Sequence, residues 1–130
     1  FPNLGFNEPW HHVSHHGNEA EKLALLVKLN TWQIGLFGKF LERLRTTPDG
    51  DGSLLDHSAI LWGSGMSDSN THSPLDVPYL MVGGGAGAFK GNRHLAAPKG
   101  TQLANTMLTV AQKYGWEIDK FGVSTGAFEL

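Results

Sequence analysis

Histidines are concentrated near the start of the chain. Four of the seven lie in HHVSHHGN, residues 11–18. His11 and His15 are four residues apart, and so are His12 and His16. A spacing of four places two side chains on one side of a helical turn, and imidazole is the commonest metal-ligand side chain. The spacing therefore predicts a metal site. The alternative is a solvated histidine-rich loop.

A second group of polar side chains lies in GSGMSDSNTHSPLDVP, residues 63–78. It follows a short apolar run, and open α/β sheets bind ligands beyond the carboxyl ends of their strands. We expect His12 and His16 to reach one metal ion, which Asp68 and His72 would complete. The full set of predicted metal ligands is His11, His12, His15, His16, Asp68 and His72, with His11 and His15 either orienting the first site or forming a second one.

The residue types indicate which metal and which chemistry to expect. Histidines with one carboxylate suit zinc, while a site of histidines without thiolate also suits copper, and the chain has no cysteine. A catalytic zinc needs a nearby acid, base or nucleophile, and Ser14 and Asp68 are the local candidates for catalytic residues. The open alternative for residues 63–78 is an ordinary turn, because Ser, Asn, Asp and Gly dominate turns.

Other candidate sites are weaker. GGGAGAFKG, residues 83–91, is rich in glycine like a phosphate-binding loop, but it lacks the spacing before a Lys-Ser or Lys-Thr pair. No helical pattern begins at these glycines, so the segment is predicted to be a turn after a strand. His57 and His94 stand singly and are predicted to be polar turn residues.

Helices and strands are predicted from hydrophobic spacing. Apolar residues recur every three or four positions over residues 19–45, which predicts a long helix with Asn18 as its cap. The short runs 59–62 and 77–82 do not alternate, which is typical of parallel strands buried on both faces. A second helix follows Gly100. We therefore expect an α/β fold in which the long helix packs on a short, mostly parallel sheet.

Bulk properties limit the function. The chain of 130 residues and 14.1 kDa is predicted to form a single domain, residues 1–130, and starts with Phe1 rather than Met. A net charge of -2 argues against nucleic-acid binding, and no apolar run reaches the roughly 20 residues of a membrane span. The long helix carries two adjacent apolar stripes, more than one core-facing seam requires, so we expect a homo-oligomer.

The order of motifs resembles a bacterial family of uncharacterised proteins named for an H-x-x-S-H-H motif. That motif is HHVSHH here, residues 11–16, and the resemblance covers essentially the whole chain. Members of this family are longer and often carry export signals. The resemblance therefore implies a periplasmic or secreted protein, of which this chain is the C-terminal segment.

More distantly, the chain is similar to the C-terminal half of the alkaline phosphatase and sulfatase superfamily. In that comparison His12 and His16 take the place of a metal-binding acid–histidine pair, and His72 that of a later histidine. Only Asp68 remains near the superfamily's Asp-His pair, and the superfamily's nucleophile lies in an N-terminal half. The resemblance implies an alkaline-phosphatase-like fold and a metal-dependent hydrolase of phosphate or sulfate esters. The alternative is a zinc- or copper-binding module without hydrolytic chemistry.

Overall fold

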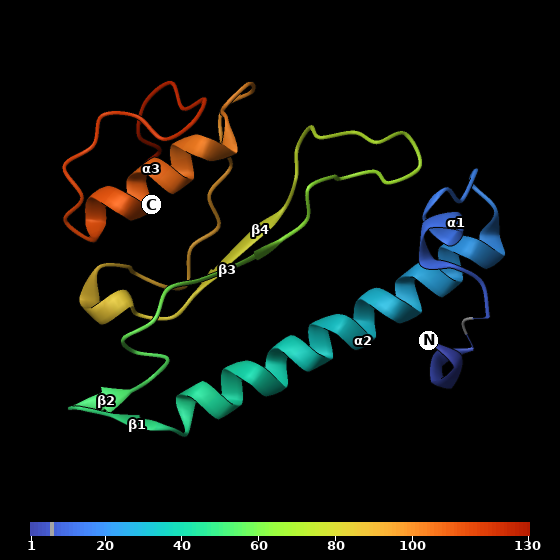
Figure 1. Cartoon of the computed structure of the whole chain (residues 1–130), viewed down its shortest axis with the longest axis horizontal. Coiled ribbons are helices and arrows are strands. Elements are labelled where there is room, and N and C mark those ends of the chain that lie inside the picture. The colour runs from blue at the N-terminus through green and yellow to red at the C-terminus, as the bar shows by residue number, and fades with distance from the viewer. Residues whose placement is uncertain (6) are drawn as a thin grey trace. The chain divides into compact units, whose positions relative to one another are not determined.

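The computed structural model describes residues 1–5 and 7–130 of the chain (Figure 1). These residues divide into two compact units. The first unit comprises Phe1–Leu54 and Ile60–Met81, and the second comprises Leu55–Ala59 and Val82–Leu130. Both candidate polar segments, residues 11–18 and 63–78, belong to the first unit.

Three helices form the first part of this unit: the 3-10 helix η1 (Pro2–Leu4), α1 (Trp10–Ser14) and α2 (Ala20–Arg45). The buried side chains of Val13, Leu26 and Leu29 join α1 to α2, with partly buried residues packed around them. The long predicted helix is confirmed, but its predicted cap is wrong. Asn18 has a φ of 64° and Glu19 takes the N-cap position without a side-chain hydrogen bond. A left-handed residue cannot adopt the extended backbone that a capping side chain requires.

The predicted parallel sheet is wrong. The strands form two two-stranded sheets, and both are antiparallel. The short strands β1 (Pro48–Asp49) and β2 (Gly52–Ser53) make one hairpin directly after α2. The other pairs β3 (Ile60–Gly63) with β4 (Tyr79–Val82), close to the runs predicted as strands.

The segment between β3 and β4 explains this difference. A parallel pair needs a crossover, usually a helix, which carries the chain back to the starting edge. Residues 64–78 instead form a loop that returns the chain beside β3, closed by an antiparallel bridge between Asp68 and Ser73 (Figure 1). The predicted alkaline-phosphatase-like architecture, which requires these strands to be parallel, is therefore wrong.

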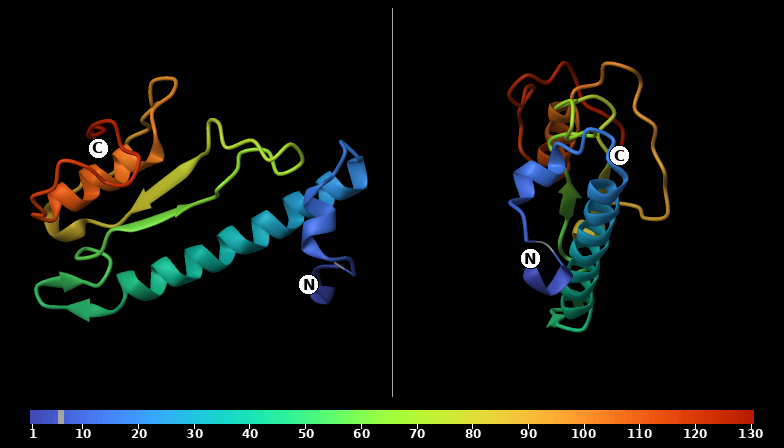
Figure 2. Two further views of the ribbon diagram at one scale, coloured as in Figure 1. Left: turned by 45° about the horizontal axis from the view of Figure 1, so that its top comes forward. Right: turned by 90° about the vertical axis from the view of Figure 1, so that its right-hand side faces the viewer.

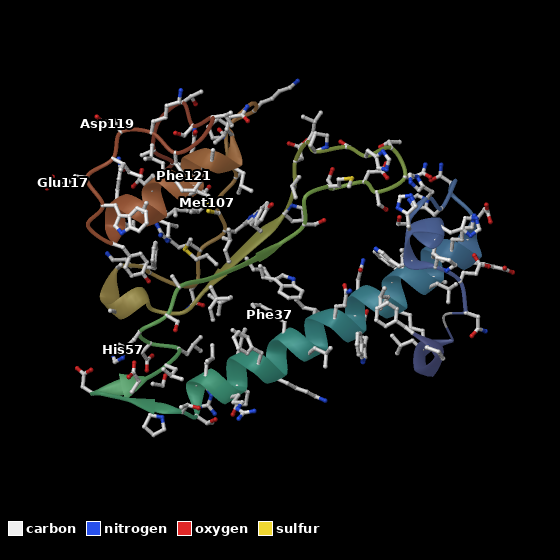
Figure 3. The ribbon with its side chains drawn as sticks, viewed as in Figure 1. Phe37, His57, Met107, Glu117, Asp119 and Phe121 are labelled. Carbon is white, nitrogen blue, oxygen red and sulfur yellow. The ribbon has the colours of Figure 1, made fainter. Side chains whose placement is uncertain are left out.

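Aromatic side chains fix the β3–β4 hairpin. The Tyr79 ring lies so close to Gly63 that a Cβ there would come 2.3 Å from it, and the Tyr79 hydroxyl donates a 2.7 Å hydrogen bond to the Ser64 carbonyl. Trp62 on β3 stacks on Phe37 of α2, with ring centroids 4.5 Å apart and planes inclined by 22°. Figure 3 labels Phe37 on the side of α2 that faces the hairpin. These contacts anchor the base of the loop 64–78.

The second unit contains the 3-10 helix η2 (Gly85–Gly87) and α3 (Leu103–Lys113). Leu108 of α3 is almost fully buried, and Thr109 both accepts from the Phe128 backbone N–H and donates to the Phe128 carbonyl. The predicted second helix is confirmed. Gly115, with a φ of 83°, follows the C-cap residue Tyr114. Within the described residues, no helix combines the length and the apolar character needed to cross a bilayer.

The glycine-rich segment at the start of this unit is the predicted turn after a strand. The backbone N–H groups of Gly84 and Gly85 donate to the carbonyls of Leu55 and Ser58 at 3.1 and 2.9 Å. The two backbone segments are so close that a Cβ on Gly84 would come 2.6 Å from the Asp56 carbonyl oxygen. The glycines therefore serve close backbone packing.

Candidate functional site

Two segments far apart in the sequence meet at one end of the first unit. One is the turn between α1 and α2, and the other is the β3–β4 loop; the two ribbons lie side by side in Figure 1 and Figure 2. Ser69 Oγ donates to the Ser14 carbonyl at 2.8 Å, and the Gly17 N–H donates to Asn70 Oδ1 at 2.8 Å. These two hydrogen bonds dock the loop on the histidine-rich turn.

The loop has a defined internal structure. The Ser67 N–H donates to the Ser73 carbonyl, and the Ser73 N–H donates to the Asp68 carbonyl, both at 2.9 Å. This pairing places His72 in the left-handed region, with a φ of 55°. Left-handed backbone at a non-glycine residue is uncommon and costs roughly 1–2 kcal/mol. The loop thus holds the His72 backbone in a conformation that is not its preferred one.

Two ring contacts link three imidazoles at this junction. The His15 ring contacts the rings of both His11 and His72, with both centroid distances 4.7 Å and both interplanar angles 77°. His11 and His15 are four residues apart at α1 and its C-cap, so one helical turn brings them together. His72 arrives from the docked loop. His11 and His72 are exposed and His15 is partly exposed, so the rings border solvent.

His16 has a different environment. Its Nδ1 accepts a hydrogen bond from the Asn18 backbone N–H at 3.0 Å, and its Nε2 lies 3.8 Å from Asp68 Oδ1. A neutral imidazole has one acceptor nitrogen and one protonated nitrogen. Because Nδ1 accepts, the proton of neutral His16 is on Nε2, toward the Asp68 carboxylate. His16 thus contacts the Asn18 backbone and lies near Asp68, and its role as a metal ligand stays a prediction.

Asp68 is held as a carboxylate. The Thr71 hydroxyl donates to Asp68 Oδ2 at 3.0 Å and the Asn70 N–H donates to Oδ1 at 2.8 Å. These hydrogen bonds, the one from Thr71 first, lower the pKa of Asp68, with a smaller contribution from the charge of His16. Ionised Asp68 therefore favours the folded loop at neutral pH, and this contribution is lost as the pH falls through the lowered pKa.

The substitution Thr71→Val tests this account of the loop. It removes the largest contribution, so the Asp68 pKa is expected to rise toward its ordinary value. A carboxyl carbon NMR titration of Asp68 measures the change. Thr101→Val is the matched control, because the Thr101 hydroxyl donates to the Pro98 carbonyl in the second unit. An identical Asp68 pKa in the wild type and Thr71→Val would contradict the assignment.

Two other predicted site residues make different contacts. His12 Nδ1 lies 2.8 Å from Glu8 Oε2, in a pair whose side chains are 65% and 57% exposed. The Ser14 hydroxyl donates to the His11 carbonyl at 2.8 Å and the residue is 7% exposed. That hydrogen bond satisfies a backbone group at the end of α1, which is a structural use of the serine. The catalytic role of Ser14 stays a prediction.

The structure thus brings His11, His15 and His72 together, and separately pairs His16 with Asp68. His57 and His94 belong to the second unit. Among the described residues, no three or more His, Cys, Asp or Glu side chains are placed so that, as they stand, they could hold a metal ion. Ser69 was missed as a docking residue, because a side chain that bonds a distant backbone carbonyl leaves no pattern in the sequence.

Comparisons with known proteins do not assign the chain to a family. No family model matches the chain, and neither a curated protein nor a solved structure matches it significantly. The two family resemblances therefore remain predictions.

Proposed function

We propose that this chain is a metal-binding module that holds one divalent transition-metal ion, zinc first, through the imidazoles of His11, His15 and His72. The observation that carries the proposal is the position of the His15 ring, 4.7 Å from both other rings. Three imidazoles without thiolate form a known zinc donor set that leaves one coordination position open, and the same set suits copper.

Energetic magnitudes favour metal binding over simple ring packing. The three rings must rotate to direct nitrogens at one ion, and an off-rotamer side chain costs about 0.5–1.5 kcal/mol. The free energy of metal binding has to exceed this cost; in zinc-finger peptides, whose ligands include thiolates, it is about 10–16 kcal/mol at pH 7. The rings border solvent, so their rotation breaks no buried packing. The left-handed His72 supports the proposal, because backbone strain is concentrated at functional sites.

Hydrolysis of phosphate or sulfate esters remains a prediction from the superfamily resemblance. The antiparallel β3–β4 pair removes the similarity of fold as support for this prediction. The Ser14 hydroxyl, the candidate nucleophile, donates its hydrogen bond to a backbone carbonyl. A hydrolase would also need an acid, base or nucleophile beside the open coordination position. Binding is the part of the prediction that the local geometry supports.

Isothermal titration of the metal-free wild type with zinc, in two buffers of different ionisation enthalpy, tests the proposal. We expect one saturable site per chain, with proton release that grows as the pH falls toward the histidine range, because ligand imidazoles must be neutral. Competition with copper then ranks the two metals. The absence of saturable binding, or several weak ions per chain without a defined stoichiometry, would contradict the proposal.

A further inference from the structure

Charge is unevenly distributed along the chain. Residues 77–116 contain no Asp or Glu, although the whole chain holds 12 acidic residues among its 130. The same stretch carries four Lys and Arg side chains, all in the second unit: Lys90, Arg93, Lys99 and Lys113. A long stretch with one sign of charge favours partners of the opposite charge.

Three of these cations lie on one extended segment between η2 and α3. Residues 88–102 form neither helix nor strand, and residues 90–100 are all exposed. Figure 2 shows this segment as a wide orange loop that returns to the start of α3. Connections longer than about 12–15 residues without secondary structure are uncommon in compact domains, and they are usually functional or disordered.

Two turns give this segment a defined course. Arg93 Nε donates to the Lys90 carbonyl at 3.3 Å, which closes the first turn. The Thr101 hydroxyl donates to the Pro98 carbonyl at 2.7 Å, which closes the second. The first turn carries two of the cations, and the second carries Lys99. The positive charges are therefore held at two separate places along the segment.

Exposed apolar side chains accompany these cations. Residues 95–97, Leu-Ala-Ala, separate the two turns, and Leu95 is 43% exposed. At the C-terminal end of α3, Tyr114 and Trp116 are 45% and 63% exposed. The Tyr114 ring lies near the start of the segment, with its centroid 6.0 Å from that of Phe89. The surface thus combines cationic, aliphatic and aromatic side chains.

This combination favours one class of anionic partner. Cations alone would serve a soluble polyanion, and an exposed aliphatic side chain gains nothing from a phosphate backbone. At a membrane surface, cations attract anionic lipids and aliphatic side chains enter the acyl boundary. Trp and Tyr are enriched at the level of the headgroups. An anionic membrane surface would therefore use all three kinds of side chain.

We propose that residues 88–102 and the C-terminal end of α3 form a docking surface for a membrane that contains anionic phospholipids. Each Lys or Arg near such a membrane raises the partitioning about 5-fold. The contact is peripheral and weakens with salt, because exposed charges are screened beyond about 10 Å at 0.1 M ionic strength. This inference does not depend on the metal site, since it uses the second unit.

Cosedimentation with vesicles of equal parts phosphatidylglycerol and phosphatidylcholine tests the contribution of charge. Lys90→Gln/Lys99→Gln is expected to bind these vesicles about 30-fold more weakly than the wild type. Lys28→Gln/Lys39→Gln is the matched control, because it removes the same charge from exposed positions of the first unit. Equal losses in the two variants, or a wild type that does not prefer these vesicles to phosphatidylcholine alone, would overturn the proposal.

The apolar side chains separate a membrane from a soluble polyanion. Leu95→Ser/Trp116→Ser is expected to weaken vesicle binding by about 10-fold or more, because both side chains would leave water on docking. Its binding to heparin, a soluble polyanion, should stay unchanged. Val27→Ser/Ile34→Ser removes exposed apolar side chains from the first unit and serves as the control. Unchanged vesicle affinity in Leu95→Ser/Trp116→Ser would show that charge acts alone and would overturn the membrane as the partner.

Discussion

Replacing His72 by alanine is expected to lower the zinc affinity of the chain by about 100-fold or more. Loss of a residue that merely orients a ligand costs about 10–100-fold, so loss of a ligand should reach at least the upper end. His72 contacts the His15 ring, although 57 residues separate the two in the sequence. Titration of each variant with zinc, against a chelator of known affinity, measures the effect.

His12→Ala is the matched control for this experiment. His12 belongs to the same histidine-rich segment, but its ring contacts Glu8 and is largely exposed. A non-specific polyhistidine site would weaken when any of its members is removed and would not depend on His72. Retained affinity in His12→Ala and in His94→Ala, with loss in His72→Ala, is the expected pattern. Equal affinities in His12→Ala and His72→Ala would contradict the proposed ligand set.

Replacing Gly83 by alanine is expected to lower the free energy of unfolding of the second unit by about 3 kcal/mol. Gly83 has a φ of 104°, and a left-handed backbone costs an L-residue roughly 1–2 kcal/mol. The added Cβ would also lie 2.2 Å from the Ser58 carbonyl oxygen, and overpacking of this kind costs typically about 1–3 kcal/mol. Hydrogen exchange of the α3 amides reports the stability of this unit.

Two other glycines separate the two contributions. Gly87 has a φ of 87° with nothing within 4 Å of its Cβ position, so Gly87→Ala should show the backbone cost alone. Gly91 has open space and no left-handed φ, so Gly91→Ala should change the stability by about 0.5 kcal/mol or less. A Gly83→Ala variant no less stable than Gly87→Ala would rule out the close packing against Ser58.

Local features of the fold were predictable from the sequence, and the pairing of distant segments was not. The hydrophobic period indicated α2 and α3 closely, and the two apolar runs are close to β3 and β4. The predicted parallel direction of the strands was wrong, because a non-alternating run of four to six residues does not distinguish a buried parallel strand from a strand in a small hairpin. The connection, residues 64–78, decides the direction through its Asp68–Ser73 bridge.

The core was also only partly predictable. Of the apolar residues on the long helix, Leu29 is fully buried, whereas Leu36 and Phe40 are 44% and 49% exposed. Spacing along a helix tells which residues share a face, but it does not tell which face another element covers. At the candidate site the same limit applies. Spacing paired His11 with His15 as readily as His12 with His16, and the choice depends on where the loop with His72 docks.

The docking of the β3–β4 loop has a consequence for the order of folding. The hydrogen bonds of Gly17 with Asn70 and of Ser69 with Ser14 join residues 53 and 55 positions apart. Closing a loop of that length costs at least about 3–4 kcal/mol of chain entropy. Each hydrogen bond contributes only about 0.5–1.5 kcal/mol to the stability of the docked state. The α1–α2 hairpin, with its short connection, is therefore expected to form early, and loop docking late.

If docking is late and only weakly favoured, the β3–β4 loop would be docked on the histidine-rich turn in only a fraction of the molecules. The apparent metal affinity would then equal the intrinsic affinity multiplied by the fraction of molecules in which the loop is docked. An ion bound by both segments would in turn slow their separation, because it binds only the docked form. The resting state of this end of the molecule would thus depend on metal concentration, even though no helix or strand changes.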